Sequence, residues 1–319
     1  MKNIIRWGVL GCARIALRQV IPAMLEAENA QPYAIASRDL ARAQQAAAEF
    51  GFEKAYGDYE SLLNDSQVDA VYIPLPNGLH KEWTIKAARA GKHVLCEKPM
   101  ALTAEDCLEM DRECRENGVK LMEAFMYRFT LRMQKLQELL DAGTIGQVRH
   151  IHANFSFVMT PDHDPRLDPA MGGGSLWDVG CYPLNLIGLL MGEEPVSFRG
   201  ERRDESGVDV AMSVALKYQN GAICTANCGF DAFSGQMAEI CGTEGSLIVR
   251  DVFLDSDAPM VLVKRDGVTT IPVTACKRYV LELEAFGKAI LENEEPPLSI
   301  RETARNCGLI ARILKETQA

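Results

Sequence analysis

Several common sequence signals are absent from this chain of 319 residues. Its ten cysteines include no Cys-x-x-Cys pair, which argues against a zinc ribbon and against a disulfide framework. There is no basic tail, and the formal net charge of -10 argues against non-specific binding to nucleic acid, which depends on clustered lysine and arginine. The apolar run "LNLIGLLM" is far too short to cross a membrane, and we find no internal repeat or low-complexity linker. These absences leave a globular protein with neither nucleic acid nor a membrane as its expected partner.

The N-terminus and the cysteines both bear on where the protein resides. The stretch "MKNIIRWGVLGCARIA" is interrupted by Arg6 and is typical of a strand rather than of a signal peptide. Scattered cysteines are typical of buried thiols in a reducing compartment, so we expect a cytoplasmic protein. The chain is 47% hydrophobic and longer than one ordinary domain, which predicts two domains with cores of their own.

The first half of the sequence alternates short apolar runs with stretches of helical periodicity. The run "IIRWGVLG" ends in glycine and is followed by "ARIALRQVIPAMLEA", whose apolar residues recur at helical spacing. Further apolar runs follow at "PYAIAS", "VDAVYIPLP", "KHVLCEKP" and "KLMEAF", with helical stretches between them. This alternation predicts a parallel, doubly wound sheet, which we assign to residues 1–123.

The second half, residues 124–319, has a different pattern. Its strands are longer and alternate between apolar and polar residues, and "YQNGAI" carries the Asn-Gly signal of a hairpin. Two helical stretches, "YVLELEAFGKAILEN" and "SIRETARNCGLIARILKETQ", close the chain. The predicted fold class is therefore α/β, with a doubly wound parallel sheet followed by an α+β domain on an open, mostly antiparallel sheet.

The turn after the first strand has features of a dinucleotide-binding turn. In a doubly wound sheet, ligands bind beyond the carboxyl ends of the strands, where loops meet helix N-termini. Residues 11–16, "GCARIA", follow the Gly-x-Gly-x-x-Gly/Ala pattern, but Ala13 stands where close approach to a pyrophosphate normally favours glycine. Such a turn is common in α/β proteins, and its place after the first strand favours a dinucleotide site.

The end of the second strand bears on the choice between NADP and NAD. An NAD site usually has an acidic residue there to accept hydrogen bonds from the ribose, whereas a 2'-phosphate needs a cation and hydroxyl donors. This sequence has Ser37 and Arg38, which favours NADP. Asp39 follows directly, so an N-cap or a ribose acceptor remains an alternative role for this end.

The second half contains one further candidate segment. Three glycines, residues 172–174, precede a helix whose first turns carry Asp178 and Tyr182. Four residues apart, these side chains are expected on one helical face. Capping and packing are as plausible for them as catalysis when the pair is taken alone.

Two short histidine patterns raise the question of a metal. "DHD" spans residues 162–164, and His150 and His152 face one side of a strand. No third ligand group stands at a recognisable spacing, so we expect no metal site.

Five motifs occur together in a single order along the chain: the Gly11 turn, "PLPNGLH", "CEKP", "MEAFMYRF" and "GGGSLWDVGCYP". In this order and spacing they resemble the Gfo/Idh/MocA oxidoreductases, the glucose–fructose oxidoreductase and inositol dehydrogenase family, over almost the whole chain. The resemblance implies a Rossmann domain that binds NAD(P), followed by a domain whose open sheet also carries oligomer contacts. It therefore implies a homodimer or a homotetramer.

The resemblance also assigns roles. The Glu97-Lys98-Pro99 motif places the family's catalytic lysine at Lys98, which explains why an apolar strand ends in charged residues, and the family often has a cis peptide bond before this proline. The motif Asp-x-Gly-x-Tyr ends in Tyr182, where inositol dehydrogenase-like members have histidine. Tyr182 is thus similar to the proton-transfer residue of the branch that contains dimeric dihydrodiol dehydrogenases, NADP-dependent xylose dehydrogenases and glucose–fructose oxidoreductase.

Together, the patterns and the resemblance give a set of expected site residues. The catalytic residues are Lys98, Tyr182 and Asp178. Those expected on the cofactor side are Gly11, Cys12, Ala13, Arg14, Ile15, Ser37, Arg38, Pro76, Asn77, His80, Glu97 and Lys98. His80 taken alone is more often a packing residue. The expected substrate neighbours are Arg128 and Arg166, for each of which surface ion pairing is equally plausible.

The expected reaction transfers a hydride between NADP, or alternatively NAD, and a carbon that bears a hydroxyl or carbonyl group. Tyr182 would exchange the proton of that oxygen, Lys98 would assist, and Asp178 would bind a second hydroxyl or orient the pair. The expected substrate is a sugar, a polyol or a trans-diol. Two alternatives remain: an NAD-dependent glycosidase of the same family and a non-catalytic sensor that binds NADP.

Overall fold

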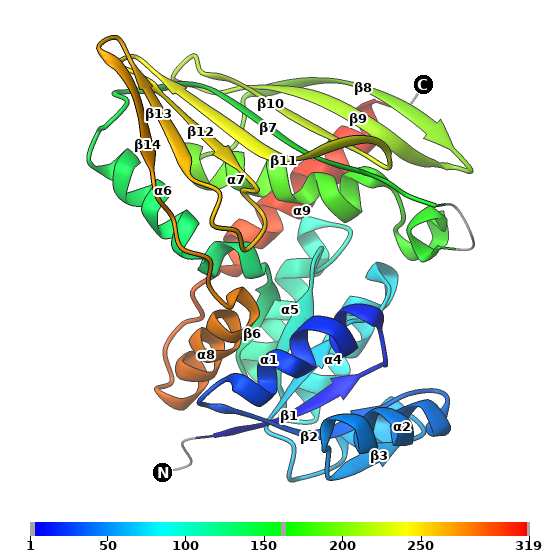
Figure 1. Cartoon of the computed structure of the whole chain (residues 1–319). Helices are drawn as coiled ribbons and strands as arrows, with labels where there is room; N and C mark the ends of the chain where they lie inside the picture. The colour runs from blue at the N-terminus through cyan, green and yellow to red at the C-terminus, as the bar shows by residue number, and fades with distance from the viewer. Residues whose placement is uncertain (1–3, 161–163, 318–319) are drawn as a thin grey trace. The chain divides into compact units, whose positions relative to one another are not determined.

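The computed structural model describes residues 4–160 and 164–317. The chain divides into two compact units (Figure 1). The first unit comprises the chain up to Met126 together with Lys277–Ala304, and the second comprises Tyr127–Cys276 and the chain from Arg305 onward.

The first unit is built on a six-stranded parallel sheet, so the predicted doubly wound sheet is confirmed. In spatial order the strands are β3 (Lys54–Tyr56), β2 (Ala30–Ala36), β1 (Ile5–Leu10), β4 (Ala70–Ile73), β5 (His93–Glu97) and β6 (Leu121–Ala124). The direction in which strands are added reverses between β1 and β4, and ligands bind at such a switch point in open α/β sheets.

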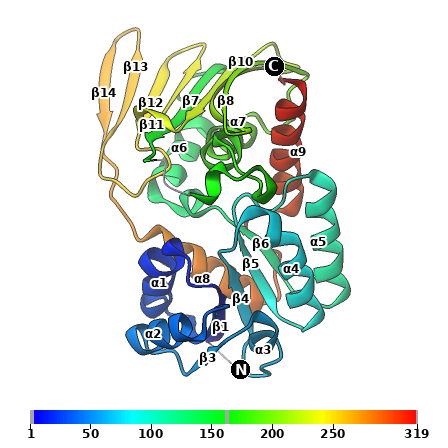
Figure 2. The same ribbon diagram turned by 90° about the vertical axis from the view of Figure 1, so that its right-hand side faces the viewer.

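Helices cover both faces of this sheet (Figure 2). Helices α1 and α8 lie on one face, and α4 and α5 lie on the other. The helical segments of the unit are η1 (Ala16–Val20), α1 (Ile21–Glu26), α2 (Leu40–Phe50), α3 (Tyr59–Leu63), η2 (Asn77–Leu79), α4 (His80–Arg89), α5 (Ala104–Glu116) and α8 (Arg278–Leu291). Because both faces are covered, the central strands are apolar along most of their length, as the sequence predicts.

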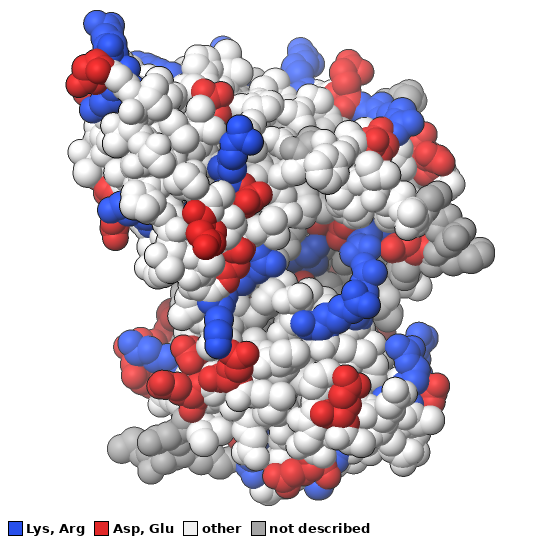
Figure 3. Space-filling model, in the orientation of Figure 1, with Lys and Arg blue, Asp and Glu red and all other residues white. Residues whose placement is uncertain are grey.

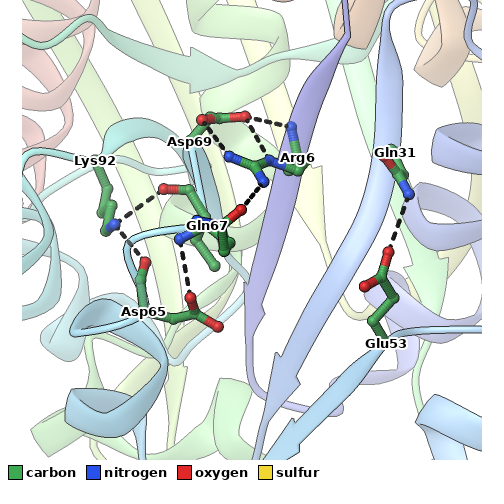
Figure 4. A network of polar contacts seen from close by, with 8 residues as sticks. Arg6, Gln31, Glu53, Asp65, Gln67, Asp69 and Lys92 are labelled. Atoms are coloured by element: carbon green, nitrogen blue, oxygen red, sulfur yellow. Dashed lines mark hydrogen bonds and ion pairs between the residues drawn. The ribbon is translucent and has the colours of Figure 1, made fainter.

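A polar network holds the amino-terminal edge of the sheet together (Figure 4). Asp69, just before β4, accepts hydrogen bonds from the backbone N–H of Arg6 at 3.0 Å and from its Nε at 3.3 Å. The Lys92 ammonium group donates to the carbonyls of Asp65 and Val68 at 2.7 and 2.9 Å. These contacts lie at the starts of β1, β4 and β5, which leaves the loops at the opposite, carboxyl edge for a ligand.

Helix α8 belongs to the first unit, although the sequence places it in a second domain of residues 124–319. The ring of Phe286 lies 6.0 Å from that of the fully buried Trp7 of β1. Asn29 Nδ2 donates to the carbonyl of Glu284 at 2.8 Å. The predicted boundary at residue 123 does not include this later segment, which returns to the first unit. The segment returns because the apolar face of α8 covers strands that are distant in sequence.

The second unit contains an eight-stranded sheet that is mostly antiparallel, as predicted, with one parallel pair between β7 and β10. In spatial order its strands are β14 (Gly267–Ile271), β13 (Met260–Lys264), β12 (Ser246–Arg250), β11 (Asp231–Gly242), β7 (Val148–Val158), β10 (Ile223–Gly229), β9 (Val208–Lys217) and β8 (Ser197–Glu205). The Asn-Gly pair at residues 220–221 lies in the hairpin between β9 and β10, where the sequence predicts it.

Helices cover one face of this sheet and leave the other bare (Figure 1). The helical segments are η3 (Met126–Phe129), α6 (Leu131–Asp141), η4 (Pro165–Leu167), η5 (Pro169–Met171), η6 (Leu176–Gly180), α7 (Cys181–Met191) and α9 (Ile300–Glu316). The first residues of α9 belong to the first unit, and the rest belong to the second.

Two further properties concern membrane-spanning helices and surface charge. No helix in the described part of the chain is long and apolar enough to cross a membrane. On the face drawn in Figure 3, acidic and basic side chains are interspersed, in keeping with 44 acidic and 34 basic residues in the whole chain.

Candidate active site

The residues expected to bind a dinucleotide lie in loops at one edge of the first unit's sheet. Gly11 follows β1, Ser37 follows β2, Pro76 lies beyond β4, and Lys98 follows β5. Because the strands are parallel, their carboxyl ends meet at the same edge, on either side of the switch point between β1 and β4. The fold therefore gathers these residues, while their individual roles stay predictions.

The turn after β1 requires glycine at its first position. Gly11 has a φ of +118°, which side chains rarely adopt, and a Cβ there would lie 3.3 Å from Leu75 Cδ2. The N–H of Gly11 donates to the carbonyl of Ala36 at 2.8 Å, which ties the turn to the end of β2. Residues 12–15 then lead directly into the helical segment formed by η1 and α1. Such a turn at a helix start suits a phosphate group.

The charges at the end of β2 fit a 2'-phosphate. The carboxylate of Asp39 accepts the N–H groups of Ala41 at 3.0 Å and of Arg42 at 3.4 Å, so it serves as the N-cap of α2. Arg38 and Arg42 are exposed, and neither forms an ion pair with a carboxylate of the described residues. With the buried Ser37 beside them, this end offers two cations and a hydroxyl, while its carboxylate is already engaged.

Two members of this cluster are not identified by the sequence motifs. Arg42 Nη2 donates to the carbonyl of Cys12 at 3.2 Å, which places Arg42 beside the glycine turn. Burial raises the pKa of Tyr59, and the charges of Arg38 and Arg42 oppose this shift, so Tyr59 faces both arginines. Burial likewise raises the pKa of Cys12 against the charge of Arg42. In the sequence, Arg42 could be assigned to this cluster only from its short spacing after Arg38. No sequence motif identifies Tyr59.

The loop after β4 and the start of α4 hold three residues expected on the cofactor side. Pro76 and Asn77 are half-buried at the start of η2, as loop residues lining a ligand would be. His80, expected on the cofactor side, has no exposed surface. Its Nδ1 faces the carbonyl of Pro99 at 2.8 Å and its Nε2 faces the carbonyl of Leu75 at 2.7 Å. The imidazole therefore connects two loops, and its role on the cofactor side stays a prediction.

The end of β5 holds Lys98 by its backbone. Tyr72 Oη donates to Glu97 Oε1 at 2.5 Å, and the N–H of Lys98 donates to Glu97 Oε2 at 3.2 Å. Burial raises the pKa of Tyr72 well above its usual range, so its hydroxyl stays a donor. The Lys98–Pro99 peptide bond is cis. Glu97 thus acts on the backbone of Lys98 rather than only as part of a cofactor lining.

In the second unit, Tyr182 lies in the first turn of α7 and its side chain is surrounded by aromatic rings. The ring centroids of Phe155, Phe253 and Tyr127 lie 5.3, 5.4 and 5.9 Å from its own. Only 4% of Tyr182 is exposed. The ring is fixed by packing, so its hydroxyl is held in one direction, as a proton-transfer group requires.

Two other predicted residues of this unit, Arg166 and Asp178, form an ion pair. Arg166 Nε lies 2.8 Å from Asp178 Oδ2, and Arg166 Nη1 lies 3.0 Å from Asp164 Oδ2. The charge of Asp178 is the main cause that raises the pKa of Arg166. Arg128 is half-buried in η3. The pairing with Arg166 orients the Asp178 carboxylate at the start of the Tyr182 helix.

Asp209 of β9, which no sequence motif identifies, fixes the start of the helical segment that carries Asp178 and Tyr182. Its Oδ2 accepts the Ser175 hydroxyl and the Leu176 N–H, each at 2.7 Å, and only 3% of the residue is exposed. Gly174 has a φ of +117°, and a Cβ there would lie 2.2 Å from Asp209 Oδ1. The glycines before the helix therefore allow the chain to approach this carboxylate closely.

We expect Asp209→Ala to destabilise the protein by about 1–3 kcal/mol, because the buried N–H of Leu176 loses its carboxylate acceptor and the Ser175 hydroxyl keeps only the weaker contact with Cys228 Sγ. Denaturant midpoints measure the loss. Asp204→Ala is the matched control: Asp204 pairs with Arg202 of its own strand, β8, but is 37% exposed, so its removal is expected to cost under about 1 kcal/mol. Equal midpoints for the two variants would contradict the role given to Asp209.

The histidine patterns do not form a metal site in the part of the chain that the structure describes. His150 Nδ1 faces the carbonyl of Ile223 at 3.2 Å, and His152 Nδ1 faces the hydroxyl of Thr225 at 2.7 Å. Within residues 4–160 and 164–317, no three metal-binding side chains cluster. Residues 162–163 of the "DHD" pattern lie outside the described residues.

Two family models match the chain. The model "Oxidoreductase family, NAD-binding Rossmann fold" matches residues 5–125, and the "GFO/IDH/MocA C-terminal domain" matches residues 133–248. The D-xylose 1-dehydrogenase (NADP(+)) 2 of Haloferax volcanii is 41% identical over 304 residues, which are 93% of this chain and 92% of that protein. The trans-1,2-dihydrobenzene-1,2-diol dehydrogenase of Mus musculus is 36% identical over 259 residues, or 79% and 77% of the two chains.

The similarity extends to solved structures. The crystal structure of KijD10, a 3-ketoreductase from Actinomadura kijaniata in complex with NADP and TDP-benzene, matches with a TM-score of 0.93. The two proteins are 33% identical in sequence, and the match covers 98% of each chain.

Proposed function

The chain belongs to the GFO/IDH/MocA oxidoreductase family, and on this premise we propose that it is an NADP-dependent dehydrogenase or reductase of sugars, polyols or trans-diols. The observation that carries the proposal is the cluster at the end of β2, where two arginines that form no ion pair with a carboxylate of the described residues stand beside an aspartate that is engaged as a helix cap. A cofactor with a 2'-phosphate satisfies both arginines, whereas NAD would find its usual ribose acceptor occupied. NAD remains the alternative cofactor.

The proposed roles follow from the chemistry of each side chain. When bound, the nicotinamide supplies or accepts the hydride. Tyr182 exchanges the proton of the substrate oxygen, and its ring is held for this by three aromatic neighbours. Lys98, the lysine of the Glu97-Lys98-Pro99 motif, assists by donating a hydrogen bond to that oxygen. Asp178, oriented by Arg166, accepts a second substrate hydroxyl.

The substrate class is inferred from the relatives. The chain is similar along most of its length to proteins named as a xylose dehydrogenase, a dihydrodiol dehydrogenase and a 3-ketoreductase. Their substrates share a hydroxyl or carbonyl carbon next to further polar groups, which suits a tyrosine with a neighbouring carboxylate. We therefore propose a small carbohydrate or diol, and not a macromolecule, as the partner in the reaction.

The bare face of the eight-stranded sheet is the proposed contact between copies of the chain. Val158 and Ile223 are 61% and 48% exposed, and Ile223 pairs with His150 in register on that face. Exposed apolar groups on an open sheet favour association. Sedimentation of the purified chain distinguishes a homodimer or homotetramer from a monomer, and a monomer would contradict this assignment.

The proposed reaction is tested by following the absorbance of the reduced nicotinamide. Purified protein is offered a panel of aldoses, inositols and trans-diols, each with NADP and with NAD. We expect turnover with one substrate class and a preference for NADP. Tight cofactor binding with no turnover across the panel would contradict the dehydrogenase, and hydrolysis of a glycoside without net cofactor reduction would indicate the glycosidase alternative.

A further inference from the structure

A single peptide unit next to Lys98 is held on both of its polar sides by buried side chains. The carbonyl of Pro99 faces Nδ1 of His80 at 2.8 Å. The N–H of Met100, in the same peptide unit, donates to Oε1 of Glu123 at 2.9 Å. His80 starts α4 and Glu123 lies in β6, so two different elements contact this peptide unit.

Both side chains are buried and are themselves fixed. None of His80 is exposed and only 1% of Glu123 is. The second nitrogen of His80 faces the carbonyl of Leu75 at 2.7 Å, in the loop after β4. The second oxygen of Glu123 accepts the hydroxyl of Thr303 at 2.9 Å. Buried polar groups with this many partners hold one arrangement, because each lost hydrogen bond leaves an unsatisfied group.

We propose that His80 and Glu123 are positioning residues that hold the Pro99–Met100 peptide unit and thereby fix Lys98 at the end of β5. This inference rests on the role of Lys98 in the proposed reaction. Neither side chain touches the reacting atoms; each acts through the backbone next to Lys98. The pair is called the Pro99–Met100 clamp below.

Charge makes the clamp sensitive to pH. Burial, the largest cause, raises the pKa of Glu123 to about 7, with Glu97 raising it further and Lys98, Met100 and Thr303 lowering it. Above this pH the ionised carboxylate accepts the Met100 N–H in a stronger, charge-assisted hydrogen bond.

The pKa of His80 shifts in the opposite direction to that of Glu123. Burial lowers the pKa of His80, and the charge of Lys98 adds to this, while the carbonyls of Pro99, Leu75 and Met100 oppose it. A neutral imidazole has one N–H and donates to one of its two facing carbonyls, whereas the imidazolium donates to both.

Two substitutions at Glu123 distinguish the effect of its hydrogen bond with the Met100 N–H from the effect of its negative charge. Glu123→Ala removes the acceptor of the Met100 N–H. Glu123→Gln keeps that acceptor, and its amide N–H replaces the oxygen that accepts the Thr303 hydroxyl, so it donates to that hydroxyl instead. The amide does not titrate. We expect Glu123→Ala to lower kcat about 10- to 100-fold, the scale for a misplaced catalytic group, and to speed hydrogen exchange at the Met100 amide. Glu123→Gln is expected to restore slow exchange and the turnover that the wild type shows below about pH 7, where its own carboxyl group is neutral.

The pH profile distinguishes positioning from a general structural role. In the wild-type protein, kcat is expected to rise through about pH 7 as Glu123 ionises. In Glu123→Gln this step is expected to be absent, because the acceptor is neutral at every pH. A profile in which the step survives in Glu123→Gln would overturn the assignment to Glu123.

His80→Ala tests the other half of the clamp against its alternative role on the cofactor side. As a positioning residue, His80 is expected to affect kcat about 10-fold or more while the Kd for NADP changes less than about threefold. A large rise in that Kd with kcat unchanged would overturn the positioning role.

The matched control is Asp69→Ala. Asp69 also accepts a backbone N–H, that of Arg6 at 3.0 Å, but at the opposite edge of the same sheet (Figure 4). It is expected to lower the stability of the first unit while leaving Met100 exchange and the pH step unchanged. If Met100 exchange changes equally in Asp69→Ala and Glu123→Ala, the clamp is not specific and the proposal fails.

The experiments also separate this inference from the proposed function. A wild-type protein that turns over no substrate on the panel contradicts the proposed reaction, and Met100 exchange, which requires no turnover, still tests the clamp. Faster Met100 exchange in Glu123→Ala with wild-type kcat would overturn the positioning of Lys98 while leaving the dehydrogenase intact.

Discussion

Tyr182→Phe is expected to lower turnover by roughly a hundredfold or more, because it removes the only atom of this side chain that can exchange a proton with the substrate oxygen. The ring itself is retained, so its contacts with Phe155, Phe253 and Tyr127 persist and the helix start is not disturbed. We expect KM and the Kd for NADP to change little, since the lost interaction acts mainly in the transition state. Steady-state kinetics and cofactor titration measure these quantities.

Tyr218→Phe is the control for this substitution. Tyr218 belongs to the same unit and is 1% exposed, so it also loses one hydroxyl from a buried ring, but it lies at the hairpin between β9 and β10. Its turnover is expected to match that of the wild type. Unchanged turnover in Tyr182→Phe, with the control behaving as expected, would rule out Tyr182 as the proton-transfer residue.

Five of the six strands of the first unit could be predicted, because burial on both faces makes them continuous apolar runs. The short edge strand β3 (Lys54–Tyr56) and two strands of the second unit lack that signal and were not predicted. Strand β8 (Ser197–Glu205) contains "GERRDE" and forms one edge of its sheet, and β14 (Gly267–Ile271) forms the other edge and is mostly exposed. An edge strand needs fewer apolar residues, so its sequence resembles that of a loop.

The family prediction is confirmed by the two matching models and by the relatives. The motifs that carried it are short and local, and each lies at a turn or a helix start, where backbone geometry restricts the residue. Gly11 is such a case, since its φ of +118° excludes most other residues. Positions of this kind can be identified from sequence alone.

The supporting residues of the candidate site could not be predicted, because their partners are remote in sequence. Glu123 contacts Met100 and Thr303, and Asp209 contacts Ser175, 34 positions earlier. Glu123 lies in the predicted apolar strand "KLMEAF", but the sequence does not show that its carboxylate accepts hydrogen bonds from Met100 and Thr303. His80 is the opposite case. The sequence identifies its motif, but only the structure shows that both ring nitrogens face carbonyl groups.

The double variant Arg38→Ala/Arg42→Ala is expected to weaken NADP binding by about a hundred- to ten-thousandfold. Each arginine is exposed and lacks a carboxylate partner among the described residues, so each is available for a charge-assisted hydrogen bond to the 2'-phosphate. Two such bonds at about 1.5–3 kcal/mol each account for the expected loss. Titration of both cofactors measures it, and the affinity for NAD, which has no 2'-phosphate, is expected to change less than about threefold.

The control is the double variant Arg89→Ala/Arg115→Ala, which removes the same charge from arginines that pair with Glu113 and Asp111 on the surface of α4 and α5. It is expected to leave both affinities unchanged. Equal losses for NADP and NAD in the Arg38/Arg42 variant would contradict recognition of the 2'-phosphate and would indicate damage to the whole site.

The preference for NADP is expected to be lost in the Arg38/Arg42 variant but not reversed. A site that favours NAD needs a carboxylate that accepts the ribose hydroxyls, and the carboxylate at this strand end, that of Asp39, is held by the N–H groups of Ala41 and Arg42 as the cap of α2. The cap uses the backbone of residue 42, so replacing its side chain leaves Asp39 in place. A variant that binds NAD more tightly than the wild type would therefore mean that Asp39 exchanges its cap for the ribose, and that the β2 end selects its cofactor by competition between these two roles.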